Sequence, residues 1–124
     1  MAVSIKQFAK ETGVSEYTLR FYEKEGVLPF VERNKNGNRI YDEQNFEWIY
    51  FIISLRETGM PLSEIKRYAE LFKQGDRTIS ERKQMMLEHK TKAEEQLTQI
   101  LKHLERINYK LALYDVMEKT VKFP

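Results

Sequence analysis

The sequence predicts a mainly α-helical fold with one small β hairpin. Its 124 residues, about one domain, include only 5 Gly and 3 Pro. A many-stranded β protein needs a turn for every ~8 to 12 residues, so an all-β fold is excluded. Apolar residues recur at helical spacing behind several capping patterns, and no Gly or Pro follows residue 75 until the last residue. Helices are therefore favoured, and one of them is long.

Composition narrows the possible functions. With 21 basic and 19 acidic residues the net charge is +2, too close to neutral to indicate a polyanionic partner, so any DNA-binding surface must be local. The absence of cysteine excludes disulfides, thiolate metal sites and thiol sensing. Residues 1–10 contain no apolar run of the length that a signal peptide needs. The longest apolar stretch, residues 48–53, is far too short for a membrane span. We expect a cytoplasmic protein that does not associate with membranes.

Residues 4–24 have the outline of a helix-turn-helix. Ser4 and Gln7 form a capping-box pattern ahead of a short helix, and Gly13 suits the left-handed position after its last turn. Ser15 then caps a second helix, which ends before Gly26. Two helices joined by a tight glycine turn predict this motif.

Residues 30–41 are predicted to form a hairpin. Asn36 and Gly37 favour a two-residue type I′ turn, which needs positive φ at both positions. Arg33, Lys35 and Arg39 surround the turn with no acid between residues 33 and 39. A basic hairpin after a helix-turn-helix predicts a winged helix-turn-helix.

Two interpretations of these residues compete. Arg20 and Tyr22 on the second helix are suited to base edges and phosphate oxygens, respectively. Alternatively, Tyr22 belongs to the core, Arg20 is merely solvated, and the hairpin is an ordinary exposed one. The order of motifs, with the basic hairpin directly after the helix-turn-helix, favours nucleic-acid contact.

Two further helices, within residues 42–75, complete a predicted DNA-binding domain at 1–75. Asp42 can cap a helix that runs to Gly59, with apolar side chains around most of its circumference. We expect one face of this helix to pack on the winged domain and another on a second subunit. Met60 and Pro61 open an amphipathic helix that ends at Gly75.

Residues 76–118 are predicted to form one long helix that dimerises, followed by a tail at 119–124. Thr78 and Glu81 form a capping-box pattern. Behind them, apolar residues alternate in steps of four and three, which is a heptad seam. This dimerisation seam consists of Ala93, Leu97, Ile100, Leu104, Ile107, Leu111 and Tyr114. The helix would be roughly 60 Å long at 1.5 Å per residue, too long to bury its seam against so small a domain, so we expect a coiled coil with a partner chain.

No pattern of residues indicates catalysis or a cofactor. His89 and His103 share a heptad position beside the seam, but two histidines without cysteine make a poor metal site, so solvated side chains are favoured. Neighbouring acids such as Glu94 and Glu95 do not face each other on a helix. Phosphate-binding glycine loops and nucleophile elbows are also absent. We expect no enzymatic activity, no metal and no cofactor.

The sequence resembles the MerR family of bacterial transcription regulators. The likeness rests on T-L-R-F-Y-E in the second helix, G-V-L-P after it and G-N-R-I-Y at the end of the wing, within residues 5–41. It continues at residues 51–67, where G-M-P-L-S-E-I-K-R joins the next two helices. About the first seventy-five residues are covered specifically, and the long helix by architecture only.

The resemblance implies a set of DNA contacts from the helix-turn-helix, the wing and the helix behind it. These residues are Ser15, Tyr17, Thr18, Arg20 and Tyr22, then Arg33, Lys35 and Arg39, and finally Arg56, which would reach a phosphate. Phe21 and Asn38 depart from the family pattern, where a tyrosine and an aromatic residue are common. No hydroxyl contact is expected at Phe21 and no stacking at Asn38.

Members of this family form homodimers through an antiparallel coiled coil and bind inverted repeats in promoters with long spacers. Activators distort the spacer so that RNA polymerase engages both promoter elements. The resemblance therefore implies a sequence-specific regulator whose partners are promoter DNA, a second copy and RNA polymerase. The alternative is a coiled-coil interaction module whose winged helix binds protein, and such a module has no need of the basic hairpin and Arg20.

Overall fold

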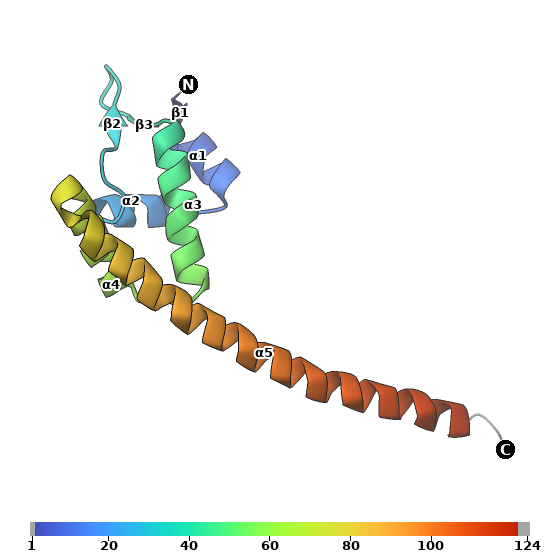
Figure 1. Cartoon of the computed structure of the whole chain (residues 1–124). Helices are drawn as coiled ribbons and strands as arrows, with labels where there is room; N and C mark the ends of the chain where they lie inside the picture. Colours follow the sequence, from blue (N-terminus) through green and yellow to red (C-terminus); the bar gives the residue numbers. More distant parts are fainter. Residues whose placement is uncertain (1, 122–124) are drawn as a thin grey trace. The chain divides into compact units, whose positions relative to one another are not determined.

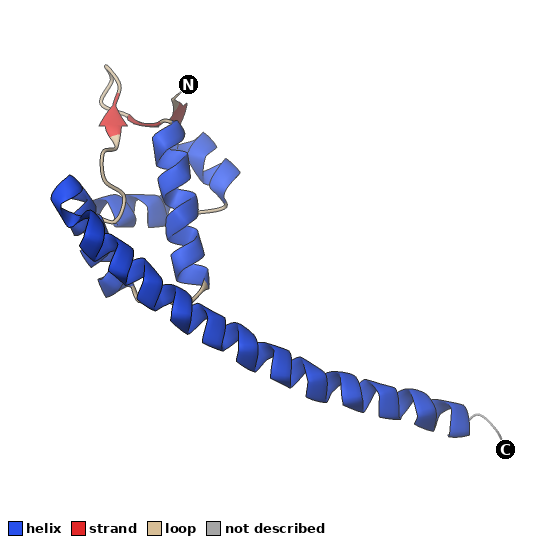
Figure 2. Ribbon diagram, in the orientation of Figure 1, coloured by secondary structure: helices blue, strands red, loops and turns tan. Residues whose placement is uncertain are grey.

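The computed structural model describes residues 2–121 and confirms the mainly helical fold with a small sheet at the wing (Figures 1 and 2). The chain divides into two units, which meet between Leu87 and Glu88. Of the predicted tail at 119–124, residues 122–124 lie outside the described part. The elements are β1 (Val3–Ser4), α1 (Ile5–Thr12), α2 (Glu16–Lys24), β2 (Glu32–Arg33), β3 (Arg39–Tyr41), α3 (Glu43–Glu57), α4 (Leu62–Lys73), the 3₁₀ turn η1 (Asp76–Thr78) and α5 (Ile79–Val121).

The helix-turn-helix begins and ends at the predicted residues. The Ser4 hydroxyl accepts a hydrogen bond from the Gln7 N–H at 3.2 Å and caps α1. Gly13 ends that helix with φ +76°, a conformation that costs a residue with a Cβ. The Ser15 hydroxyl caps α2 by accepting from the Thr18 N–H at 3.1 Å. Local capping therefore fixes the turn between the two helices.

The core of the first unit lies between α1, α2, α3 and the sheet. Phe8 of α1 stacks on Tyr41 of β3, with ring centroids 4.2 Å apart and planes inclined by 8°. Leu19 of α2 and Ile49 and Ile52 of α3 are completely buried in the same cluster. The recognition motif and the wing are thus anchored to one apolar cluster, which fixes their relative positions.

The sheet has one more strand than the hairpin predicts. Its order is β1-β3-β2, all antiparallel, and Val3 pairs with Tyr41. The predicted type I′ turn is wrong, because Gly37 has φ +78° but Asn36 does not have positive φ. The Asn34 carbonyl instead accepts from the Gly37 N–H at 3.0 Å, and its side-chain oxygen accepts from the Asn36 and Asn38 N–H groups, each at 3.0 Å. These bonds stabilise a wider turn.

Helix α3 is covered on a second face by α4 of its own chain. Trp48 packs against Phe72 and Tyr68 of α4, with ring centroids 4.7 and 5.8 Å apart. The Trp48 indole N–H donates to the Val27 carbonyl at 2.7 Å. The amphipathic helix α4 supplies these aromatic side chains, so the apolar circumference of α3 is partly satisfied within the first unit.

Helix α5 begins without the predicted capping box. Thr78 is buried in η1, and its hydroxyl donates to the Leu71 carbonyl at 2.6 Å. Glu81 instead forms an exposed ion pair with Arg67 at 3.1 Å. The Thr78 hydroxyl bonds to α4 and does not cap α5, because the 3₁₀ turn η1 places it beside the last turn of α4.

Replacing Asp42 with alanine is expected to lower the free energy of unfolding by about 1 kcal/mol. The Asp42 carboxylate accepts from the Asn45 N–H at 3.1 Å, and the Asn45 side chain accepts from the Asp42 N–H at 2.9 Å. Urea denaturation followed by Trp48 fluorescence measures the change. Asp42→Ser keeps a capping oxygen and should retain most of the stability, whereas equal losses in both variants would contradict the capping role.

Candidate nucleic-acid interface

The exposed side of α2 carries the side chains predicted to meet DNA. Tyr17 is 79% exposed, and Arg20 projects from the same helix. Arg20 forms an ion pair with Glu16 one turn earlier, at 3.3 Å and with both side chains well exposed. Exposed pairs of this kind contribute little free energy, so Arg20 remains available to a stronger acceptor.

A hollow of about 370 Å³ lies between α2, the wing and the N-terminal strand, and it is called the wing hollow below. Arg20 of α2, Arg33 of β2 and Arg39 of β3 all line it, together with Lys6 of α1. No acidic residue is among the described residues that line it. The chain is nearly neutral overall, but the structure gathers these cations into one local basic surface.

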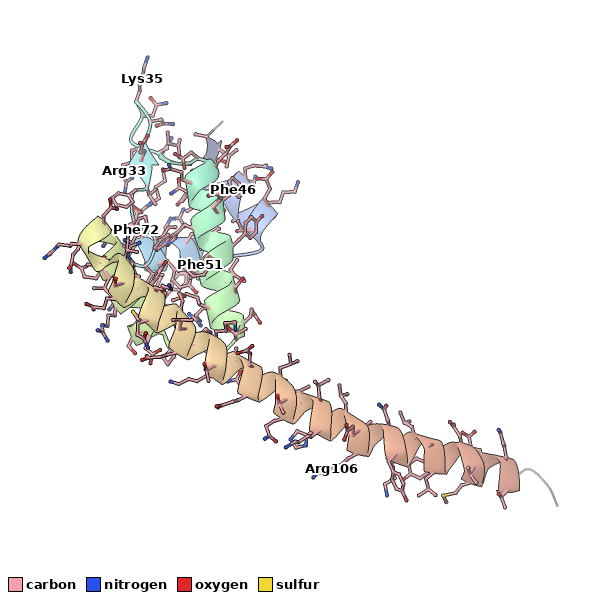
Figure 3. The ribbon with its side chains drawn as sticks, in the orientation of Figure 1. Arg33, Lys35, Phe46, Phe51, Phe72 and Arg106 are labelled. Atoms are coloured by element: carbon pink, nitrogen blue, oxygen red, sulfur yellow. The ribbon has the colours of Figure 1, made fainter. Side chains whose placement is uncertain are left out.

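The wing presents its cations in two ways. The Arg33 guanidinium donates to the Gly37 carbonyl at 2.8 Å and so braces the turn. Lys35 lies at the tip of the hairpin and points away from the rest of the unit (Figure 3). Lys35 is therefore suited to contact a phosphate of the DNA backbone. Such a contact does not depend on the base sequence.

Arg39 joins the wing to α2. Its guanidinium is paired with the Glu23 carboxylate, and both side chains are about three-quarters buried. The hydrogen bond from Arg39 to Glu23 raises the pKa of the arginine. Because the pair joins β3 to α2, Arg39 fixes the position of the wing relative to the recognition helix. The same side chain also lines the wing hollow.

A second hollow, of about 410 Å³, opens at the N-terminus of α2 and is called the cap hollow below. Ser15 and Thr18 line it from the first turn of α2, and Arg56 lines it from α3. Unpaired N–H groups and the helix dipole make such an N-terminus attractive to anions. The Arg56 guanidinium favours a phosphate in the cap hollow, whereas the Glu57 carboxylate, which also lines it, opposes one.

Tyr22 belongs to both the core and the cap hollow. Its side chain is 7% exposed, as the alternative interpretation of this residue predicts. Tyr22 nevertheless lines the cap hollow, and its hydroxyl accepts a hydrogen bond from the Arg56 guanidinium at 3.0 Å. Tyr22 therefore orients the Arg56 guanidinium. Because its ring is buried, only its hydroxyl group could contact a bound anion.

The second unit presents the predicted dimerisation seam to solvent. Six of its seven residues are between 45% and 57% exposed, namely Leu97, Ile100, Leu104, Ile107, Leu111 and Tyr114. Ala93, at the start of the seam, is partly buried. Contiguous exposed apolar residues on one stripe of a helix indicate an interface with another chain.

Residues 2–121 contain neither a cluster of metal ligands nor a membrane-spanning helix. No group of three or more His, Asp or Glu side chains in this range could hold a metal ion. Nor is any helix in this range long and apolar enough to cross a membrane.

Comparison with known proteins identifies the family. Residues 3–71 match the profile of the MerR HTH family regulatory proteins, and residues 46–109 match the profile described as MerR, DNA binding. The chain belongs to the MerR family. This confirms the resemblance drawn from the residues of the second helix, the wing and the junction after Phe51.

Individual MerR relatives agree with this assignment. An uncharacterised HTH-type transcriptional regulator of Haemophilus influenzae is 39% identical over 114 residues, which cover 92% of this chain and 84% of the relative. The regulator AdhR of Bacillus subtilis is 39% identical over 88 residues, 71% of this chain and 63% of AdhR. The crystal structure of HiNmlR, a MerR family regulator lacking the sensor domain, bound to promoter DNA, has a TM-score of 0.89 and 37% identity, covering 96% of this chain and 94% of HiNmlR.

Sequence reasoning missed two residues of this candidate interface. Glu23 fixes Arg39 from sixteen residues away, and Lys6 adds a fourth cation to the wing hollow. Helical spacing carries no signal for a contact between a helix and a strand. The position of Lys6 follows from the pairing of β1 with β3. This pairing could not be predicted, because a strand of two residues has no recognisable sequence pattern.

Proposed function

We propose that this MerR family protein is a transcription regulator that binds promoter DNA as a homodimer. The observation that carries the proposal is the convergence of Arg20, Arg33 and Arg39 on the wing hollow. Arginine is suited to guanine edges and to phosphates, and the wing and the recognition helix present both kinds of contact from one rigid unit. The residues proposed to meet DNA are Ser15, Tyr17, Thr18, Arg20, Tyr22, Arg33, Lys35, Arg39 and Arg56.

The dimerisation seam supports the second half of the proposal. Two copies that pack through Ala93 to Tyr114 in an antiparallel coiled coil would present two winged units to an inverted repeat. Distorting the spacer between the half-sites costs on the order of 1 to 10 kcal/mol, which contacts made by the bent DNA offset. RNA polymerase would then engage the distorted promoter. Because bacterial promoter DNA lies in the cytoplasm, a cytoplasmic location is implied, and this role needs no enzymatic activity.

The salt dependence of binding to duplex DNA tests the proposal. Raising salt from about 50 mM to about 200 mM should weaken binding steeply, because each cation placed on a phosphate releases a counterion. Fluorescence anisotropy of a labelled duplex measures the slope of log affinity against log salt. A protein that shows no DNA affinity at the lower salt concentration would instead fit the protein-binding alternative.

A further inference from the structure

A third hollow, of about 440 Å³, lies in the first unit and shares no lining residue with the wing hollow or the cap hollow. It is called the aromatic pocket below. Glu47, Trp48 and Phe51 line it from one face of α3, Tyr68 and Phe72 from α4, and Pro29 and Phe30 from the segment before the wing. Figure 3 labels Phe51 and Phe72. Its volume falls within the range of about 300 to 1,000 Å³ that small-molecule sites occupy.

The walls of the aromatic pocket are ring systems packed against each other. Trp48 and Tyr68 are stacked, with centroids 5.8 Å apart and planes inclined by 25°, and Phe51 lies 5.6 Å from Tyr68. The faces of such rings carry partial negative charge and attract cations. Phe72 already shows this property, because the Arg82 guanidinium carbon lies 5.4 Å from its centroid. Arg82 does not line the pocket, and it is held by Thr78 and Gly75.

The aromatic pocket has one carboxylate in its lining. Glu47 is the one ionisable acid or base, tyrosine aside, among the described residues that line it. Within residues 2–121 no hydrogen bond or ion pair engages the Glu47 carboxylate. The aromatic pocket therefore combines aromatic rings with a solvent-exposed carboxylate, and this is the chemistry that recognises an organic cation.

The backbone at the mouth of the aromatic pocket is strained. Phe30 has φ +62°, and no other described residue apart from glycine has positive φ. Its ring is 67% exposed and lies edge-on to Phe72, with centroids 6.0 Å apart. An aromatic residue rarely adopts this conformation, and such strain concentrates at ligand-binding sites. Here it places an exposed ring at the edge of the pocket.

We propose that the aromatic pocket binds a small organic cation of the substituted ammonium class. The ammonium group lies against the rings of Trp48 and Tyr68, and the Glu47 carboxylate neutralises its charge. Pro29 and Phe30 lead directly into the wing, so a bound cation would bear on the position of the wing. This last link alone rests on the proposed function.

Trp48 is the single tryptophan of the chain and lines the pocket, so its emission reports occupancy directly. Choline and dimethylbutanol, in which a tert-butyl group replaces the trimethylammonium group, form a matched pair of probes. Titration of the full chain with choline should change Trp48 emission saturably, and dimethylbutanol should bind at least about fivefold more weakly. Because no DNA is present, failure of this site is distinguishable from failure of DNA binding.

Variants locate the bound probe. Glu47→Gln should weaken choline binding by about tenfold while leaving dimethylbutanol unaffected, because only the charge is lost. Tyr68→Leu should weaken choline about fivefold. Glu11→Gln removes an acid from α1, outside the pocket, and should change nothing.

Four results would overturn the proposal. The first is no change of Trp48 emission with choline at millimolar concentrations, and the second is equal binding of the two probes. The third is an equal loss of choline binding in Glu11→Gln and Glu47→Gln. The fourth is emission that depends on protein concentration and not on choline, which would show that a second copy covers the pocket.

Discussion

Leu104→Asp is expected to dissociate the protein into monomers and to abolish its binding to a paired half-site. Leu104 lies at the middle of the dimerisation seam and is 45% exposed in the single chain. Burying an aliphatic side chain contributes about 1.5 to 3 kcal/mol, so the seam residues of two chains together outweigh an association cost of about 4 to 15 kcal/mol. In a two-fold dimer the substitution places a charge in the seam from both chains.

Analytical ultracentrifugation of the parent and the variant at micromolar concentration measures this effect. Thr98→Asp is the matched control, because residue 98 lies on the same helix but outside the seam, and this variant should remain dimeric. Trp48 packs on α4 of its own chain, so its emission should stay unchanged while the first unit remains folded. A parent that sediments as a folded monomer, or a Thr98→Asp variant that dissociates equally, would contradict the role of the seam.

The parts of the fold that the sequence predicts are those that depend on local hydrogen bonds. Ser4, Ser15 and Asp42 each cap a helix by accepting from a residue three positions later, so a short pattern is sufficient to locate each helix start. The pairing of Val3 with Tyr41 connects distant segments through a two-residue strand, and no periodicity reveals it. The Thr78 hydroxyl illustrates a third case, because tertiary packing draws a plausible cap residue into a different hydrogen bond.

The candidate site divides in the same way. Arg20, Arg33 and Arg39 were predictable because motif order and charge place them on a recognition helix and a wing. What could not be predicted is how each cation is held, because the Glu23 carboxylate that pairs with Arg39 comes from another element. The aromatic pocket shows the same limit. The apolar residues of α3 indicate burial, but their spacing does not distinguish a neighbouring helix of the same chain from a second subunit.

Arg20→Ala is expected to weaken binding to a cognate site by about 1 to 3 kcal/mol and to relax the preference for that sequence. Arg20 lies on the exposed side of α2, and its present partner is a weak surface ion pair with Glu16. Breaking the Arg20–Glu16 ion pair costs little free energy. Nearly all of the free energy of a bidentate contact between Arg20 and a base edge would therefore favour the cognate sequence over others. Selection of bound sequences from a random duplex library identifies the cognate site, and anisotropy titrations on that site and a scrambled one measure both effects.

Lys35→Ala provides the matched comparison, since it also removes one cation but from the tip of the wing (Figure 3). A phosphate contact carries no sequence information, so this variant should weaken binding to all sequences about equally and lower the salt slope by about 1. Arg20→Ala should instead lose more affinity for the cognate site than for the scrambled one. If both variants lose the same factor on both duplexes, Arg20 meets only the phosphate backbone, and base recognition must come from other exposed side chains of α2 such as Tyr17.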